Sequence, residues 1–260
     1  MFDPLPAARL LHQLRQDRTP LTRLPAAIAP STAAEGAAVQ VALAALVDNQ
    51  RPAGFKIGAT GKRMQAYLGV DAPIAGFIRH ADLYRHQATL RFDDFIKPGV
   101  ECEVAVRLAR DLPPGPCSLP RALAAVGDFF AGIEIVDNRY GDLAELGTPT
   151  LLADQMYHGA AVISDRHDIN WRELPIDALH GRIWLDDGTA DAGITSDLLG
   201  HPLNGLAWLA GSAEAAVFGG LKAGQVVLLG SVTPPLWLRA PATVTVAFPP
   251  LPPVTVRWHA

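Results

Sequence analysis

The sequence predicts an α+β fold in which a helical N-terminal segment precedes a β-rich domain. Residues 1–50 carry helical patterns, whereas from Gly54 onward short β-branched or aromatic runs alternate with Gly, Pro and Asp-Gly turns. No Gly-x-Gly-x-x-Gly motif opens a helix, which disfavours a doubly wound nucleotide-binding sheet. We therefore expect residues 1–50 to pack as a helical segment on a main domain formed by residues 51–260.

The first helices are expected in the N-terminal segment. Ala7–Gln16 has an amphipathic pattern, and Ser31-Thr32 followed by Glu35 is typical of a capped helix that continues through an alanine-rich run to Asp48. Later helices are predicted at Lys62–Leu68, Pro120–Phe129 and His201–Phe218. Strands are predicted at Phe55–Ile57, Val100–Leu108, Ile133–Val136, Ala160–Ile163, Ile183–Leu185, Val226–Leu229, Ala242–Phe248 and Val254–Trp258. The segment Asp186-Asp187-Gly188-Thr189 predicts a tight turn between two paired strands.

Composition excludes several classes of function. The 260 residues are 49% hydrophobic and 18% charged with a net charge of -4, so the chain has no basic field for a nucleic-acid partner. The longest apolar stretches, 37–47 and 203–216, are interrupted by polar residues, and we expect no membrane span. The N-terminus lacks a secretory signal pattern, which predicts a cytoplasmic location. Cys102 and Cys117 are too few for a disulfide framework and lack the spacing of a cysteine metal site.

Paired acids in an apolar strand are the sharpest chemical feature. In an extended strand Glu101 and Glu103 project to one face, while Cys102 and Val104 project to the other. Two like charges this close would repel and raise each other's pKa unless a cation lies between them. The alternative is an edge strand with both glutamates in solvent.

A third acid, Glu134, lies in the middle of the apolar run 131–136. A buried acid is normally paired or bound to a metal, and three carboxylates without a Cys/His cluster favour Mg²⁺ or Mn²⁺. Asp137 faces the opposite side by parity and is expected to support the site or to pair with Arg139. Lys56, flanked by glycines, is either a surface lysine or a cation directed at an anionic substrate.

These segments resemble the fumarylacetoacetate hydrolase superfamily, in particular its branch of 2-keto-4-pentenoate hydratases and 2-oxo-3-hexenedioate (4-oxalocrotonate) decarboxylases. The order and spacing of the matching stretches span nearly the whole chain. They are GFKIGATGKRMQAYLGVDAP at 54–73, KPGVECEVAVRLARDLP at 97–113, AGIEIVDNRYGD at 131–142, LLADQMYHGAAVIS at 151–164, SDLLGHPLNGLAWLA at 196–210 and GSVTPP at 230–235.

The resemblance implies a mixed β-roll or sandwich of the fumarylacetoacetate hydrolase C-terminal-domain type. It also implies that Mg²⁺ or Mn²⁺ is held by Glu101, Glu103 and Glu134, and that Lys56 acts at the substrate. Residues 51–260 would then be the catalytic domain. Homo-oligomers are common in the family, and the resemblance also allows association with a sister decarboxylase or hydratase.

Some positions depart from the family pattern. Hydratases of this branch carry a segment like Asp-Asn-Ala-Ser where this chain has Asp154-Gln155-Met156-Tyr157, so Tyr157 replaces the serine. Asp82 is the residue that would take the place of a displaced family aspartate as a catalytic group. His201 matches a family motif and either caps a helix or binds substrate. His80 or His158 is a further hypothesis for proton transfer.

The sequence therefore predicts a metal-dependent hydratase that adds water to a 2-hydroxy-dienoate or 2-oxo-alkenoate in the catabolism of aromatic compounds. One alternative is decarboxylation of 2-oxo-3-hexenedioate. A carbon-carbon hydrolase acting on an acylpyruvate and a non-catalytic partner subunit of the same fold are the others.

Overall fold

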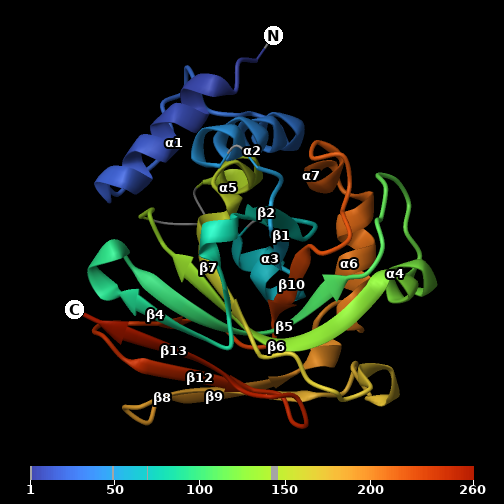
Figure 1. Cartoon of the computed structure of the whole chain (residues 1–260). Coiled ribbons are helices and arrows are strands. Elements are labelled where there is room, and N and C mark those ends of the chain that lie inside the picture. Colours follow the sequence, from blue (N-terminus) through green and yellow to red (C-terminus); the bar gives the residue numbers. More distant parts are fainter. Residues whose placement is uncertain (1, 49, 69, 142–145) are drawn as a thin grey trace.

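Two β-sheets form the body of the molecule, and helices lie above the larger one (Figure 1). The computed structural model describes residues 2–48, 50–68, 70–141 and 146–260. Within these residues the path of the larger sheet runs through β2 (Ile74–Ile78), β1 (Gly54–Gly58), β10 (Val226–Ser231), β5 (Pro98–Leu108), β6 (Val126–Asp137), β7 (His158–Ile163) and β3 (Leu83–Arg85), and β11 (Leu236–Trp237) pairs with β5. The smaller sheet runs through β4 (Gln87–Arg91), β13 (Val254–His259), β12 (Thr243–Ala247), β8 (His180–Leu185) and β9 (Ala190–Ile194).

Both sheets are mixed. The pairs β1/β10, β3/β7 and β4/β13 are parallel, and the other strand pairs are antiparallel. The predicted turn at 186–189 joins β8 to β9, and Gly188 adopts a φ of 90° there. The predicted α+β class is confirmed.

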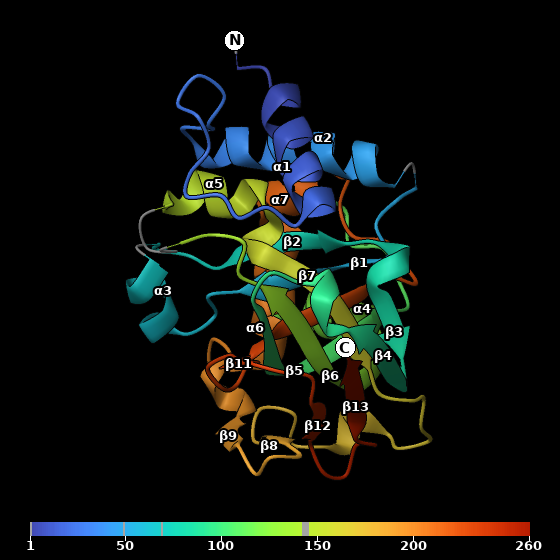
Figure 2. The ribbon, with the colours of Figure 1, turned by 90° about the vertical axis from the view of Figure 1, so that its left-hand side faces the viewer.

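The helices of the N-terminal segment lie over one side of the larger sheet, as Figure 2 shows. They are α1 (Leu5–Asp17) and α2 (Ala33–Val47). Thr32 caps α2 by accepting a hydrogen bond from the Glu35 N–H, and the Glu35 carboxylate accepts one from the Ser31 N–H, which confirms the predicted capping pattern. Buried residues of both helices belong to the same hydrophobic cluster as the larger sheet.

The remaining helices are α3 (Lys62–Leu68), α4 (Leu119–Ala125), α5 (Gly147–Ala153), α6 (Pro202–Gly211) and α7 (Ala213–Ala216). The helix predicted at 120–129 ends earlier, because residues 126–129 begin β6 and pair with β5. The helix predicted at 201–218 is divided at Ser212, whose side chain accepts from the Ala215 N–H and caps α7. None of the helices within the described ranges is both long and apolar enough to cross a bilayer.

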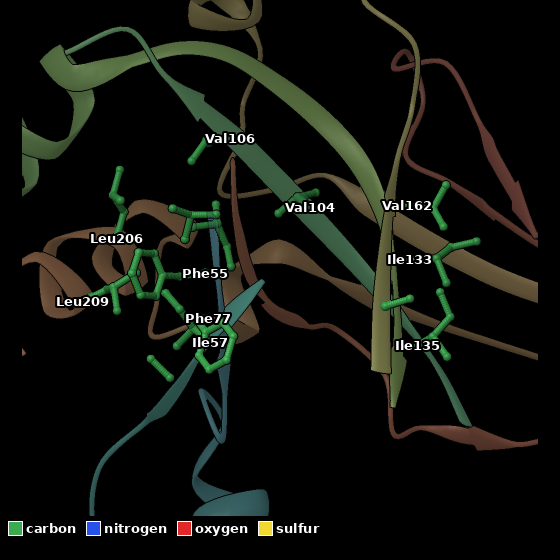
Figure 3. Packing of buried hydrophobic residues seen from close by; sticks show 14 of the residues in the cluster. Phe55, Ile57, Phe77, Val104, Val106, Ile133, Ile135, Val162, Leu206 and Leu209 are labelled. Carbon is green, nitrogen blue, oxygen red and sulfur yellow. The ribbon is translucent and has the colours of Figure 1, made fainter. Parts of the chain in front are cut away.

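The main core fills one face of the larger sheet. Leu206 and Leu209 of α6 lie beside Phe55 and Phe77, and the cluster continues along β5, β6 and β7 (Figure 3). Valines of β12 and β13 join the same cluster, so the smaller sheet covers this face of the larger one. Even-numbered residues of β5 point into this core, and its odd-numbered residues therefore point to the opposite face.

Candidate metal centre

Strand register brings three acids together on the face of the larger sheet that is opposite to the main core. Glu101 of β5 is the direct partner of Glu134 of β6, and Glu103 lies two residues further along β5. One ligand oxygen of each of the three lies within 4.8 Å of the others. Glu103 and Glu134 are fully buried, whereas Glu101 is partly exposed. The structure thus brings together the three glutamates that the sequence predicts as metal ligands.

One oxygen of Glu134 is held by two nitrogen donors. Lys56 Nζ lies 2.8 Å from Glu134 Oε1, and His158 Nδ1 lies 2.9 Å from the same atom. Lys56 and His158 are themselves buried. Lys56 is therefore not a surface lysine, and its ammonium belongs to the centre.

The remaining oxygens of Glu103 and Glu134 have fewer hydrogen-bond donors. Glu103 Oε2 accepts a hydrogen bond of 3.0 Å from the Gly230 N–H, and Gly230 has a φ of 107° that an L side chain rarely adopts. Glu103 Oε1 and Glu134 Oε2 are buried and have no hydrogen-bond partner among the described residues. Buried oxygens without partners are costly, and a hard cation is the ligand that satisfies several carboxylates at once. The donor set fits Mg²⁺ or Mn²⁺.

The electrostatics of the centre favour the binding of a cation. Burial, together with Glu134, raises the pKa of Glu101 to about 8. Burial and the two neighbouring glutamates raise the pKa of Glu103 well above its ordinary value. Burial also disfavours ionised Glu134, yet the Lys56 charge and the His158 hydrogen bond outweigh it and lower the pKa of Glu134. Without a cation, a full set of three carboxylates is therefore disfavoured near neutral pH.

A β-bulge brings His158 to the centre. The register between β6 and β7 shifts after Ile135, so that His158 becomes the partner of Val136 and lies on the same face as Glu134. Bulges redirect a side chain in this way beside active sites. His158 was a hypothesis for proton transfer from the sequence, and the structure shows its contact with a candidate metal ligand.

The segment that replaces the expected hydratase motif has an unusual backbone. Gln155, Met156 and Tyr157 have φ values of 55°, 48° and 50°. Left-handed conformations cost about 1–2 kcal/mol for each such residue. The turn places the Tyr157 ring 5.8 Å from Lys56 Nζ and 6.5 Å from the Trp237 ring. The Tyr157 ring therefore lies beside the Lys56 ammonium, and the Trp237 ring lies next to Tyr157.

Hydrogen bonds from two distant segments hold this turn. Gln155 Nε2 donates to the Phe77 carbonyl at 2.5 Å, and Arg15 of α1 donates to Gln155 Oε1 at 2.5 Å. Arg15 and Arg139 both bind the preceding carboxylate of Asp154. The turn is therefore fixed from the N-terminal helix and from the end of β6.

Three other residues singled out in the sequence have structural partners. Asp82 forms an ion pair with Arg79, whose Nη2 lies 2.7 Å from Asp82 Oδ1. His201 caps α6, since its Nδ1 accepts a hydrogen bond of 3.1 Å from the Leu203 N–H. Asp137 accepts hydrogen bonds from the backbone of residues 96 and 97 and lies 3.8 Å from Arg139, as its parity predicts. Catalysis by Asp82 and substrate binding by His201 stay predictions.

Comparison with known proteins connects this arrangement to metabolic enzymes. The chain is 30% identical over 196 residues to a 2-keto-4-pentenoate hydratase of Burkholderia vietnamiensis, covering 75% of this chain and 74% of the relative. It is 33% identical over 188 residues to a 2-hydroxyhexa-2,4-dienoate hydratase of Comamonas testosteroni, covering 71% and 70%. A solved structure of 4-oxalocrotonate decarboxylase from Pseudomonas putida G7, complexed with magnesium and adipate, superposes with a TM-score of 0.88 at 22% identity and covers 98% of this chain and 97% of that one. No family model matches the chain.

Proposed function

This chain belongs to the hydratase and decarboxylase branch of the fumarylacetoacetate hydrolase superfamily, and from that premise we propose that it is a metal-dependent hydro-lyase. The proposed reaction adds water to a 2-hydroxy-dienoate or 2-oxo-alkenoate, an acid of the kind formed when aromatic rings are degraded. The observation that carries the proposal is the convergence of Glu101, Glu103 and Glu134 on the face opposite the main core. Relatives at 31–33% identity are hydratases by name, which supports hydration over other reactions of the family.

The proposed resident group is a divalent cation, Mg²⁺ or Mn²⁺. When bound by the three glutamates it supplies Lewis acidity toward the 2-oxo acid and stabilises negative charge on oxygen. Solved neighbours support this choice, since one decarboxylase structure contains magnesium and a fumarylpyruvate hydrolase of similar fold contains Mn²⁺ and pyruvate. The identity of the ion in this chain belongs to the proposal.

The other side chains near the centre have separate proposed roles. Lys56 donates one hydrogen bond to Glu134 and keeps two further N–H donors for the carboxylate of the substrate. Tyr157 and Trp237 present apolar surface that excludes water from one side of Lys56. Asp82, held in place by its ion pair with Arg79, offers a carboxylate oxygen that can accept a proton. We assign substrate orientation to Lys56 and propose Asp82 as the acceptor.

Decarboxylation of 2-oxo-3-hexenedioate is the second candidate. Tyr157 stands where hydratases of this branch carry a serine, so a hydroxyl suited to handling water is replaced by a ring. Both reactions would develop negative charge on the 2-oxo oxygen, and the residues that would hold the cation are the same for the two. The two functions therefore differ in the substrate and not in the metal centre.

A turnover assay tests both functions. Purified protein is supplied with 2-hydroxypenta-2,4-dienoate or with 2-oxo-3-hexenedioate, first with Mg²⁺ or Mn²⁺ and then with EDTA. We expect metal-dependent loss of the dienoate with formation of the hydrated 2-oxo acid. Release of carbon dioxide from the hexenedioate alone would favour the decarboxylase. Absence of turnover with either acid, while the protein still binds metal, would reject both.

We also propose that the enzyme is a cytoplasmic homo-oligomer. The expectation comes from the resemblance of the chain to metabolic enzymes of this family. Light scattering coupled to size-exclusion chromatography measures the mass of the assembly. A mass equal to the 27.7 kDa of one chain would contradict it.

A further inference from the structure

An arginine-lined cavity lies beside the metal centre. Its volume is about 300 Å³, at the lower end of small-molecule sites. Its lining comes from the end of α1, the segment after β2, strand β4, the end of β6 and the start of β7. In Figure 1 these segments meet at the edge where the lower end of α1 approaches β4 and β7. Chain segments far apart in sequence thus contribute to one cavity that is open to solvent on one side.

Positive charge exceeds negative charge in the lining of this cavity. Five arginines and three aspartates line it. The arginines are Arg15, Arg18, Arg79, Arg91 and Arg139. Burial and the neighbouring Arg139 lower the pKa of Arg15, and the Asp154 charge, which raises this pKa, does not outweigh them. Asp154, which lies behind the lining, neutralises part of the charge of Arg15 and Arg139, and a carboxylate bound in the cavity would neutralise more of it.

Two of these arginines reach the surface at the cavity. One of them, Arg18, donates a hydrogen bond of 2.5 Å from Nη1 to the Asp93 carbonyl and keeps further N–H donors for a ligand. Arg18 and Arg91 are about half exposed, at 51% and 53%. Their carboxylate neighbours lie at 4.0 Å and 3.8 Å, beyond normal hydrogen-bond distance. Exposed pairs of this kind contribute about 0–1 kcal/mol, so an incoming carboxylate can displace them at little cost.

His158 joins the cavity to the metal centre. It lines the cavity, and its Nδ1 contacts Glu134. Its Nε2 is buried and has no hydrogen-bond partner among the residues that the structure describes. Gln155, which begins the left-handed turn beside Lys56, lines the same space. His158 is therefore shared by the cavity and the metal centre.

We propose that this arginine-lined cavity binds a carboxylate group of a small organic acid. The carboxylate has two sources, the far end of a dicarboxylic substrate or a separate organic acid. The first source rests on the proposed function, and the second does not. Planar guanidinium groups bind carboxylates through paired hydrogen bonds, which makes arginine a better match than lysine for this ligand.

Calorimetric titration of metal-free protein in EDTA tests the cavity without the metal centre. The probes are adipate and hexanoate, which have equal carbon number and differ by one carboxylate. The test variant is the double substitution Arg18→Gln and Arg91→Gln. The matched control is the double substitution Arg110→Gln and Arg239→Gln, which removes the same charge from exposed arginines outside the cavity. We expect adipate to bind the parent and the control with equal affinity and the test variant at least tenfold more weakly.

Steady-state kinetics distinguish the two sources. If the carboxylate is that of the substrate, the test variant raises KM for 2-oxo-3-hexenedioate at least tenfold and leaves KM for 2-hydroxypenta-2,4-dienoate unchanged. If it is a separate acid, neither KM changes while adipate binding is still lost. Adipate that binds parent and test variant equally, or fails to bind metal-free parent, overturns the proposal. Arginine-dependent binding without any turnover would reject the proposed function and leave the cavity site standing.

Discussion

Replacing Glu103 with glutamine tests the metal centre through stability as well as binding. The change removes one negative charge but keeps an oxygen that can accept the Gly230 N–H. At an effective dielectric constant of about 20, two unit charges 4.8 Å apart repel by about 3.5 kcal/mol. The carboxyl groups escape part of this repulsion by binding protons. We therefore expect metal-free Glu103→Gln protein to be more stable than the parent by about 1–3 kcal/mol at pH 9.

The sign of the pH dependence follows from the raised pKa of Glu103. A carboxyl group whose pKa is higher in the folded state keeps its proton longer when folded, so the folded state is favoured at low pH. That advantage is lost as the pH rises above the ordinary value of the unfolded chain, about 4.3. At pH 5, close to that ordinary value, little of the advantage has been lost, and the variant and the parent should differ least in stability. The difference in the free energy of unfolding between the variant and the parent should increase from pH 5 to pH 9.

Metal binding should change in the opposite direction. Loss of one of three ligands should weaken Mn²⁺ binding at least 100-fold, or about 2.8 kcal/mol. Urea unfolding at pH 5 and pH 9 with EDTA measures stability, and calorimetric titration with MnCl₂ measures affinity. Glu214→Gln is the matched control, because burial raises the pKa of Glu214 in α7, away from the three ligands. Parental Mn²⁺ affinity in Glu103→Gln, or no gain in stability at pH 9, would refute the assignment.

Three further substitutions give separate readouts. Lys56→Met should reduce turnover at least 100-fold. It should also lower the free energy of unfolding of metal-free protein by about 3 kcal/mol, because Glu134 stays buried without the Lys56 ammonium. An unchanged free energy of unfolding would contradict the buried ion pair. Gly76→Ala should lower turnover, because a Cβ there would lie 2.9 Å from the Gln155 carbonyl oxygen and would displace the turn at 155–157 beside Lys56. Kinetic constants equal to those of the parent would contradict this effect of the turn. Leu206→Ala should lower the free energy of unfolding by about 2–5 kcal/mol in thermal or urea unfolding while leaving Mn²⁺ affinity intact.

Local pattern was enough to predict the strand that carries two of the ligands. Alternation along β5 assigns Glu101 and Glu103 to one face, and the apolar neighbours of Glu134 predict a buried strand. Direct pairing of Glu101 with Glu134 is a matter of register between strands, which the spacing of one segment does not determine. The capped helix α2 was likewise predictable, since its cap involves residues within four positions of one another.

Features that depend on contacts between distant segments could not be predicted from the sequence. The bulge that turns His158 toward Glu134 leaves no distinctive pattern in HGAAVI. The arginines of the cavity are scattered singly along the chain and meet only after folding. The boundary between α4 and β6 was misplaced because residues 120–125 favour helix, and pairing with β5 decides where the strand begins.

The N-terminal helical segment is part of the site and not an appendage. Three consecutive left-handed residues at 155–157 store strain, and such strain persists only where surrounding contacts enforce it. Arg15 supplies several of those contacts, because it binds both Asp154 and Gln155 from α1. The same turn holds the Tyr157 ring beside Lys56 and contributes Gln155 to the arginine-lined cavity. The position of α1 therefore influences the wall of the metal centre and the mouth of the cavity together, although α1 contributes none of the three metal-binding glutamates.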